Sequence, residues 1–536
     1  MAERLTDDTL DIGAREAMLE NVQLAEGLDD NLSIMDLMVG PAPDVARRRL
    51  EIRLAEGYID AAVFHIEGIV DRTQAQRIIK AVSEVCLESP QDMLDRLRYG
   101  PLATSDVRSL HTFVDAWNAM VEGDVVILID GHRKALACAS QAYKTRAISE
   151  PPTDTTLRGP RQGFVESLPD NLALLRQWIG TPNLWIESIT IGHLTHTQVV
   201  MLYIKGLASE ELLAEIRQRV QRIRTDMMLG ADPLMEMIQD SHLNFVPLGL
   251  STERTDRVVG NVLEGRVALL VNNSPFALVL PMEYGMMFQA ADDYYEFVPI
   301  VTLITTLRVI AFWVMILLPG FFVAVLTFHQ ELLPTPLLIR IVADRAGVPF
   351  PVALEVLLME LVFELLREAG LRLPRAVGSA VTIVGALILG EAAINAGLVS
   401  PSVIVTVAAT AICSFVLPTF SFSIPIRLLR FPFIAFGALL GLLGVELGLV
   451  ALIAFLCSHR SFGHPFMSPM APVTPGIFTD YVFRHWKWGQ SVRPLLTGGR
   501  EPVRQTEGMA PRQTLDPERV GAGQWNGNDN AGKSGE

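Results

Sequence analysis

Apolar positions in the first half of the chain follow two alternating patterns. From Asp60 a short apolar run predicts a strand that ends at Gly68, and from Thr73 to Leu87 apolar residues recur at helical spacing. A second helical stretch is expected over 107–120. It is followed by two short strands about a turn at 130–133. These elements form one α/β unit.

The same order of patterns returns further along the chain. A strand over 199–207 contains Gly206 near its end, an amphipathic helix follows over 209–223, and a hairpin pattern occupies 263–280. The Gly68 to Gly123 separation is 55 residues, and the Gly206 to Gly265 separation is 59. We therefore expect two homologous α/β subdomains in tandem, over 56–150 and 171–290. The alternative is that short apolar strands look alike by chance.

Polar segments precede and connect these subdomains. Residues 1–55 are predicted to be a polar lead-in, in which the run of arginines at 47–49 forms a solvated face. The linker over 151–170 contains glycines and a proline that force a turn, from which Arg158 and Arg161 project. The two guanidiniums suit an anion, a carboxylate pair, or a subunit or interdomain contact. Pairing with local acids is the competing interpretation.

The second half of the chain is apolar enough for a membrane. We expect an α-helical polytopic membrane domain over 297–458, with crossings at 297–328, 377–397, 401–418 and 431–457. If residues 352–369 also cross, there are five crossings and the C-terminal tail lies outside; if they lie in the interface, there are four and the tail is cytosolic. A membrane-proximal segment over 459–498 and a disordered tail over 499–536 follow.

Composition supports this organisation and excludes several functions. Mean hydropathy is +0.33 and 50% of the residues are hydrophobic, as in membrane proteins. The N-terminus has no signal-peptide pattern, so the N-terminal subdomains are expected in the cytosol. A net charge of -15 argues against nucleic acid, and four scattered cysteines imply neither disulfides nor a metal site. No nucleotide, cofactor or catalytic motif is present, so we expect neither a cofactor nor an enzyme.

The stretch Pro349–Pro374 combines an apolar sequence with a row of acids. Glu360, Glu364 and Glu368 follow one another at four-residue spacing, on one face of a predicted helix, and Glu355 precedes them. An isolated carboxylate inside a membrane is costly, so such residues pair, take up a proton or face water.

Two further acids stand alone in apolar segments, Glu391 and Glu446. Against all these acids we count two intramembrane bases, Arg308 and Arg367, with Arg367 placed to neutralise Glu364 and Asn395 placed to support Glu391. The excess favours cations, and in a symmetric oligomer one acid per subunit becomes a ring. The candidate pore or polar membrane residues are Glu360, Glu364, Glu391 and Glu446. Glu355 and Glu368 have a headgroup-zone alternative, and a role in helix packing alone stays open.

Small residues mark the last apolar segment. Two G-x-x-x-G patterns remove side-chain bulk from one helix face, at Gly437, Gly441, Gly444 and Gly448. They predict close packing against another helix.

Four longer motifs resemble one known family. They are Arg-Gly-Pro-Arg-Gln-Gly-Phe-Val-Glu-Ser at 158–167, the acidic stretch at 347–374, Ile-Val-Gly-Ala-Leu-Ile-Leu-Gly-Glu-Ala-Ala-Ile-Asn-Ala-Gly-Leu-Val-Ser-Pro at 383–401, and Arg-Ser-Phe-Gly-His-Pro-Phe-Met-Ser-Pro-Met-Ala-Pro at 460–472. In this order they look like the A subunit of GerA-family spore germinant receptors.

The resemblance implies a multi-pass protein of the spore inner membrane with cytosolic N-terminal subdomains. It also implies a transporter-like B subunit and a lipoprotein C subunit as partners, and a homo-oligomer, a pentamer, that forms a channel releasing monovalent cations during germination. A SpoVAF-like accessory channel subunit shares this architecture. The less favoured alternatives are a nutrient-binding transporter, for which the membrane half has no visible repeat, and a membrane scaffold.

Overall fold

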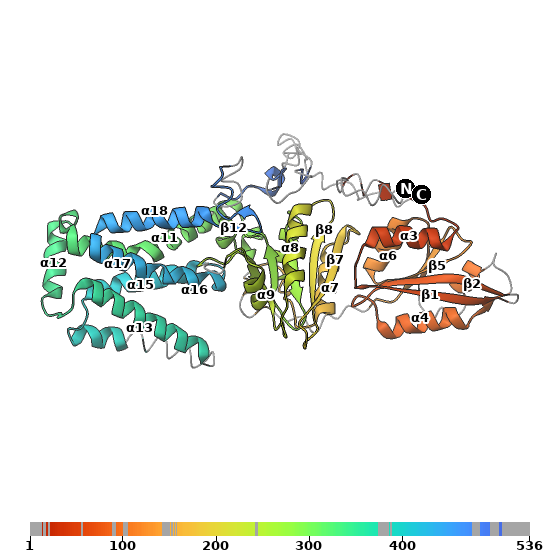
Figure 1. Cartoon of the computed structure of the whole chain (residues 1–536), viewed down its shortest axis with the longest axis horizontal. Helices are drawn as coiled ribbons and strands as arrows, with labels where there is room; N and C mark the ends of the chain where they lie inside the picture. Colours follow the sequence, from red (N-terminus) through yellow and green to blue (C-terminus); the bar gives the residue numbers. More distant parts are fainter. Residues whose placement is uncertain are drawn as a thin grey trace, which may run out of the picture.

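The computed structural model describes residues 22–54, 57–87, 93–99, 106–141, 158–241, 245–373, 388–473, 483–493 and 503–505, together with isolated positions that include 154 and 156. Two sheet-containing subdomains and a helical bundle follow one another along the long axis of the molecule (Figure 1).

The first subdomain contains α3 (Leu28–Val39), β1 (Val45–Leu54), β2 (Gly57–Ile66), α4 (Arg72–Glu84), β3 (Cys86–Leu87), α5 (Met93–Tyr99), β4 (Val107–Leu110), α6 (Phe113–Glu122), β5 (Asp124–Ile129) and β6 (Ala135–Ala139). The sheet order is β3-β1-β2-β5-β6-β4. Helices α3 and α6 share a core with Phe64 of β2, whereas α4 shares a second core with its neighbour Val63. Successive side chains of a strand point to opposite faces, so the run 61–64 of β2 is apolar and fully buried because helices cover both faces.

The second subdomain contains α7 (Leu168–Trp178), β7 (Leu184–Ile191), β8 (Thr197–Ile204), α8 (Glu210–Arg222), α9 (Ala231–Ile238), β9 (Leu250–Thr252), α10 (Thr255–Val262), β10 (Val267–Val271) and β11 (Ala277–Leu280). Its sheet order, β7-β8-β10-β11-β9, repeats the order β1-β2-β5-β6-β4. The paired glycines also match, because Gly68 and Gly206 have φ of 89° and 85°, and Gly123 and Gly265 have φ of 95° and 91°. These left-handed conformations favour glycine, which explains why the repeat can be recognised in the sequence from its glycines.

The structure corrects the prediction of a lead-in over 1–55. Residues 28–54 form α3 and β1, and β1 pairs with β2 over its whole length. The arginines at 47 and 49 form ion pairs with Asp36 and Asp29 of α3, so this polar segment belongs to the first sheet. Tertiary pairing with β2 decides the conformation here, and polar composition hides it.

The predicted helix over 107–120 begins later than expected. Residues 107–110 are β4, and α6 starts at Phe113 after Thr112, whose hydroxyl accepts a hydrogen bond from the Asp115 backbone N–H at 3.0 Å. The Asp115 carboxylate in turn accepts from the Thr112 backbone N–H, which completes a capping box.

A buried ion pair fixes the two subdomains to each other. Arg176 of α7 donates from Nε and Nη2 to the two oxygens of Asp44, which precedes β1, at 2.8 and 3.2 Å. Trp117 of α6 donates from Nε1 to the Gly180 carbonyl at 2.6 Å. Both side chains of the ion pair are almost fully buried, so the subdomains form a packed unit.

The described residues between the second subdomain and His459 are mainly helical. They include η1 (Tyr284–Met287), η2 (Ala291–Tyr294), α11 (Val298–Phe328), η3 (Gln330–Leu332), α12 (Thr335–Arg345), α13 (Val352–Arg372), α15 (Pro401–Val416), α16 (Phe420–Leu428), α17 (Arg430–Leu440) and α18 (Leu442–Ser458). Helix α12 lies at the end of the bundle far from the sheets (Figure 1). Among the described residues, α11 alone is long and apolar enough to cross a membrane by length and composition, and α15 and α18 are shorter apolar helices.

The prediction of one continuous helix over 431–457 is wrong. The chain turns at Gly441, whose φ is 64°, and α18 packs back along α17. A Cβ atom at Gly441 would lie 3.0 Å from the Cβ of Phe328, so both conformation and space require glycine there. The first part of the segment predicted at 377–397 lies outside the described residues, and 388–395 are helical.

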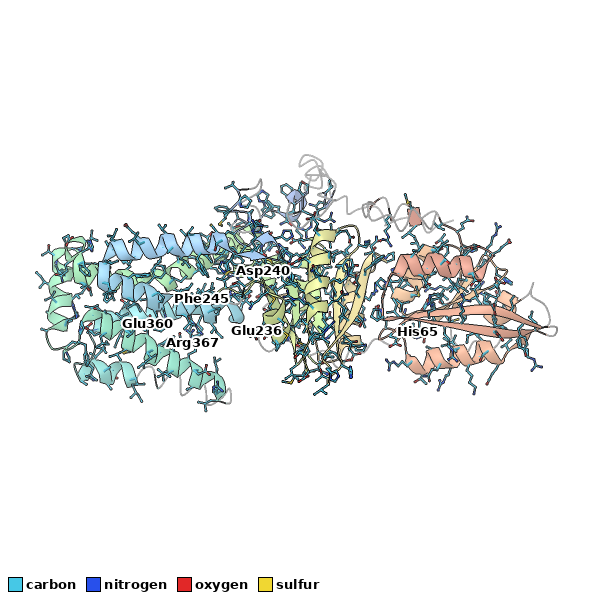
Figure 2. All side chains as sticks on the ribbon, in the orientation of Figure 1. His65, Glu236, Asp240, Phe245, Glu360 and Arg367 are labelled. Atoms are coloured by element: carbon cyan, nitrogen blue, oxygen red, sulfur yellow. The ribbon has the colours of Figure 1, made fainter. Side chains whose placement is uncertain are left out.

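The chain returns to the sheets after α18. The short hairpin of β12 (Arg460–Ser461) and β13 (His464–Pro465) packs on the second subdomain. Ser461 Oγ donates to the Leu248 carbonyl at 2.7 Å and accepts from the Met282 N–H at 3.0 Å, and Phe462 N–H donates to Asp240 at 2.6 Å. Figure 2 shows Asp240 where the second subdomain meets the bundle. Apart from 503–505, the tail predicted to be disordered lies outside the described residues.

Candidate functional site

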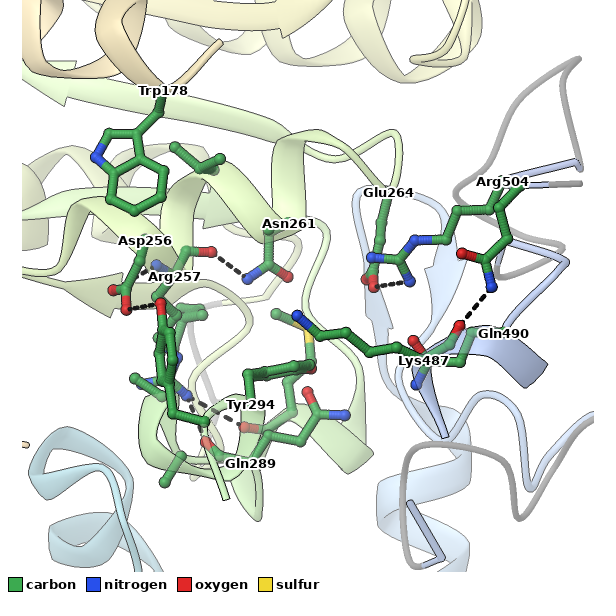
Figure 3. Close-up of a pocket in the computed structure, with 18 residues that line it drawn as sticks. Trp178, Asp256, Arg257, Asn261, Glu264, Gln289, Tyr294, Lys487, Gln490 and Arg504 are labelled. Carbon is green, nitrogen blue, oxygen red and sulfur yellow. Dashed lines mark hydrogen bonds and ion pairs between the residues drawn. The ribbon is translucent and has the colours of Figure 1, made fainter. Parts of the chain in front are cut away.

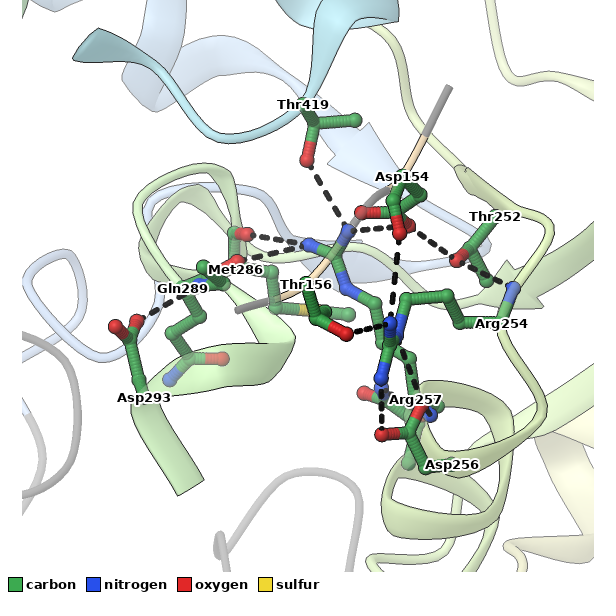
Figure 4. Close-up of polar contacts among 12 residues, drawn as sticks. Asp154, Thr156, Thr252, Arg254, Asp256, Arg257, Met286, Gln289, Asp293 and Thr419 are labelled. Carbon is green, nitrogen blue, oxygen red and sulfur yellow. Dashed lines mark hydrogen bonds and ion pairs between the residues drawn. The ribbon is translucent and has the colours of Figure 1, made fainter. Parts of the chain in front are cut away.

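Two buried arginines lie at the start of α10, one of them at its N-cap, and bind different parts of the chain (Figure 4). Arg254 forms a bidentate pair with Asp256 at 3.0 and 2.7 Å and donates to Thr156 at 2.8 Å and to the Pro160 carbonyl at 3.1 Å. It therefore holds the linker against the start of α10.

Arg257 crosses from the subdomain to the helices. Its Nη1 donates to Thr419, the residue before α16, at 3.1 Å, and its Nη2 donates to the Gln289 carbonyl at 3.0 Å. Burial lowers the pKa of the Arg257 guanidinium from its ordinary value, and the nearby Asp154 carboxylate opposes this effect. The contact ties α16 directly to α10, so displacement of one element acts on the other.

A second charged cluster lies inside the helical bundle, where Figure 2 places Glu360. The Glu360 carboxylate of α13 lies 2.6 Å from Arg430 of α17, and both side chains are fully buried. Thr410 of α15 donates its hydroxyl to Glu360 at 2.9 Å. Glu364 also pairs with Arg430 and lies 3.6 Å from Arg427. These contacts hold α13 against α15 and α17.

Other charged side chains of this region are also bonded within the chain. Glu355 accepts from the backbone N–H and the hydroxyl of Ser400 at 3.0 and 2.9 Å and pairs with Arg345 at 3.0 Å. Arg367, expected beside Glu364, instead donates to Ser414 at 2.6 Å. Its guanidinium also lies 4.6 Å from the centre of the Phe415 ring.

The cluster changes the charge balance inferred from sequence. The expected acidic excess omitted Arg345, Arg427 and Arg430, which the structure places against Glu355, Glu360 and Glu364. The signal available in the sequence was Arg427 and Arg430 at three-residue spacing within apolar residues, a position that requires a buried acid as partner.

Glu391 and Glu446 differ from the acids of α13. Both are exposed on the bundle, although their neighbours along the chain are apolar. Asn395, expected to support Glu391, is exposed as well. Glu368 is exposed and pairs with Arg372 on the same helix. The structure therefore separates the predicted acids into a group bonded between helices, Glu355, Glu360 and Glu364, and three on the surface, Glu368, Glu391 and Glu446.

The remaining predicted residues have contacts within the chain. Arg158 of the linker pairs at 3.0 Å with Glu296, which lies 138 residues further along the chain and just before α11, and Arg161 also has a partner. Gly437 faces Gly320 of α11 so closely that a Cβ atom would lie 2.3 Å from the Gly320 carbonyl oxygen.

The other glycines of the same patterns lie between α17 and α18. A Cβ atom at Gly444 would meet the Phe436 carbonyl oxygen at 2.3 Å, one at Gly448 would meet the Phe436 ring at 2.9 Å, and Gly441 forms the turn. No group of three His, Cys, Asp or Glu side chains arranged for a metal ion occurs among the described residues.

Comparisons with known proteins give one consistent result. The family model of the Bacillus/Clostridium GerA spore germination protein matches residues 33–496. The chain is 39% identical to spore germination protein KA of Bacillus subtilis (strain 168), over 91% of this chain and 90% of that protein. It is 36% identical to spore germination protein GerLA of Bacillus cereus, over 82% of this chain and 87% of that protein.

One solved structure is also similar. The crystal structure of the N-terminal domain of the A subunit of the Bacillus megaterium spore germinant receptor GerK3 is 27% identical, covers 48% of this chain and 95% of its own, and has a TM-score of 0.35.

Proposed function

Since this chain belongs to the GerA family of spore germination proteins, we propose that it is the A subunit of a germinant receptor, whose copies form a channel that releases monovalent cations. The family match confirms the resemblance of the four motifs. In this proposal the protein is multi-pass in the spore inner membrane, with its sheets in the cytosol, and works with a transporter-like B subunit and a lipoprotein C subunit.

Exposed apolar side chains support insertion of the whole bundle. Large hydrophobic residues are more than half exposed on several helices: Leu303 (61%), Val405 (69%), Ile412 (66%), Leu439 (73%) and Val450 (65%). In water such a surface marks an interaction or membrane site, and lipid chains cover it without cost. These exposed side chains support a membrane location for α15, α17 and α18 as well as for α11.

The observation that supports an oligomer is that Glu391 and Glu446 are exposed on this apolar surface of the bundle. A carboxylate that faces lipid is unfavourable, and its cost grows with its depth in the membrane. Contact with a second copy, or with a water-filled path between copies, removes that cost. Copies arranged in a closed ring, a pentamer in our proposal, would present these acids repeatedly to a cation.

Glu360 and Glu364 have a different role in this proposal. Their partners Arg430 and Arg427 offset the negative charge that would attract a cation, and the contacts link three helices. We therefore assign Glu360 and Glu364 to holding α13 against α17, and Glu391 and Glu446 to the cation path or the subunit contact.

Potassium release from germinating spores tests the proposal. In E391Q and E446Q spores we expect slower release on nutrient addition at unchanged level of the chain, because the substitution removes the charge and keeps the side-chain size. E368Q is the matched control, since Glu368 is an exposed acid paired on its own helix. Wild-type release from both test variants, with the chain present at normal level, would contradict the assignment of these two acids.

A further inference from the structure

Residues 483–493 lie beside the start of the longest apolar helix. The Arg484 backbone N–H donates to the Thr302 hydroxyl of α11 at 3.3 Å, and the Arg484 guanidinium lies 4.8 Å from the centre of the Tyr294 ring. Thr302 is in the first turns of α11, and Tyr294 ends η2 just before it. If α11 spans a bilayer, this segment is at the level of the lipid headgroups on the side of the sheets.

The segment exposes aromatic rings there. Trp486 and Trp488 are stacked, with ring centroids 6.3 Å apart, and are 47% and 41% exposed; Phe483 is 50% exposed. Nearby, α11 begins with an exposed apolar face that includes Leu303 and Leu307, at 61% and 52% exposure. Trp residues are enriched at membrane interfaces because the ring is apolar and its N–H is polar.

Charge in the segment has one sign. Residues 483–493 contain Arg484, Lys487 and Arg493 and no acid. Nε and Nη1 of Arg484 are buried, with the guanidinium beside the Tyr294 ring, and have no hydrogen-bond partner among the described residues. Basic residues next to a membrane span are attracted to anionic lipid headgroups.

A cavity adjoins the segment. It has a volume of about 260 Å³, and Lys487 reaches into it beside Tyr294 (Figure 3). Its acids are engaged, because Glu264 pairs with Arg266 and Arg504, and Asp256 pairs with Arg254. Among the described residues, Lys487 forms no ion pair. The cavity therefore offers an ammonium group and aromatic walls to an anionic group.

We propose that residues 483–490 and the adjoining cavity form a docking site for the headgroups of anionic phospholipids, with Lys487 facing the phosphate, Arg484 adding positive charge beside it, and Trp486 and Trp488 in the interface. The proposal rests on the membrane location given under the proposed function. It adds that the C-terminal segment binds the same bilayer and so anchors the second subdomain beside α11.

The test is tryptophan quenching in the purified full chain, reconstituted in nanodiscs of phosphatidylglycerol or phosphatidylcholine with or without bromine near the headgroup end of the acyl chains. The contribution of Trp486 and Trp488 is the difference between the wild type and W486F/W488F, in which phenylalanine preserves the apolar surface. The contribution of Trp313, inside α11, is obtained in the same way from W313F.

We expect brominated phosphatidylglycerol to quench the Trp486 and Trp488 contribution. The quenching should be weaker in phosphatidylcholine, and R484Q/K487Q should lose this dependence on lipid charge. Quenching of Trp313 with none of Trp486 and Trp488 would overturn the docking site and point to a protein partner on this surface. Equal quenching in the two lipids would overturn recognition of the anionic headgroup. Absence of Trp313 quenching would instead contradict the membrane location itself.

Discussion

Arg430 is the residue on which the packing of the bundle depends most. Its side chain is fully buried, and it pairs with Glu360, also fully buried, and with Glu364. Removing one partner of a buried ion pair leaves an unpaired charge, which usually costs more than the pair contributes. The acids of α13 therefore stabilise its packing against α17 through their pairs with Arg430, and their negative charge is largely neutralised.

We predict that R430M lowers the stability of the detergent-solubilised protein by about 3–5 kcal/mol, because it leaves the Glu360 charge unpaired. E360Q/R430M should recover much of the loss, since it removes both charges. R372Q is the control, because the Arg372 to Glu368 pair is exposed and is worth at most about 1 kcal/mol. Thermal unfolding measures all three variants, and a double variant no more stable than R430M would contradict the ion-pair account.

His464 gives a prediction for pH. Burial in β13 lowers its pKa below the ordinary value of 6.5; Glu283 and Glu211 oppose the shift and Arg266 adds to it. The unfolded segment therefore binds a proton more readily than the folded one. The contribution of neutral His464 to folding stability is fully present above about pH 6.5, and it is lost as the pH falls from there toward the lower pKa of the folded state.

Hydrogen exchange of residues 459–466, corrected for intrinsic rates, measures this effect. The free energy of opening obtained from the protection should fall on acidification from pH 7.5 toward pH 5.5. The loss is at most about 1.4 kcal/mol for each unit by which the folded pKa of His464 lies below its unfolded pKa. H464Q should lose most of the pH dependence. Equal pH dependence in H464Q and the wild type would exclude His464 as its source.

At this scale the sequence predicted which residue types are unusual but not which of them meet. Glu360, Glu364, Glu391 and Glu446 all stand out as acids among apolar residues. Glu364 and Arg430 are 66 positions apart in the sequence, so no local pattern reveals their contact. Arg254 and Arg257 were missed for the same reason, because their partners come from the linker and from the residue before α16.

Helices α11 and α17 cross so closely that their backbones are in contact, which only glycine at the crossing point allows. Gly437 and Gly320 face each other, and a Cβ atom at either would lie within 2.5 Å of a backbone oxygen of the other helix. Since backbone cannot move aside as a side chain can, we expect G437A to destabilise the bundle by about 1–3 kcal/mol.

G390A is the matched control for this prediction. Gly390 is also helical, and a Cβ atom there would have its nearest neighbour at 4.0 Å, so no loss is expected. Thermal unfolding of the purified chain compares the two variants. Equal effects would show that the close approach of α11 and α17 does not limit stability.

Elements with strong local signals were predicted best. The strands that precede Gly68 and Gly206 and the amphipathic α4 and α8 agree with the structure. Helix α3 and strands β1 and β7 were not predicted, because polar and apolar residues are mixed in their sequences. The conformation of the two strands depends on their pairing with β2 and β8. The break between α17 and α18 was missed because Gly441 was interpreted as part of a packing motif.

At the scale of the whole molecule, the contacts of β12 and β13 place the segment after α18 against the second subdomain. If the bundle lies in a membrane as proposed, the second subdomain and residues 459–466 are on the same side, so an even number of crossings separates them. The expected counts of four and five both took 431–457 as a single crossing, and the turn at Gly441 removes that premise.

Labelling of single cysteines with a membrane-impermeant thiol reagent tests this arrangement. In intact cells expressing a cysteine-free background, we expect D344C, in α12 at the far end of the bundle, to react from outside (Figure 1). V492C, and S83C in α4 as its control, should react only after permeabilisation. Reaction of V492C from outside would contradict a shared side for the sheets and the C-terminal segment.

The central claim is that copies of this chain surround a cation path, and the mass of the solubilised full chain tests it most directly. Native mass spectrometry of the protein released from mild detergent should give a homo-oligomer, with a mass of five chains for the proposed pentamer. A monomer at every detergent condition that preserves the fold would leave Glu391 and Glu446 without a subunit to cover them, and would contradict the account.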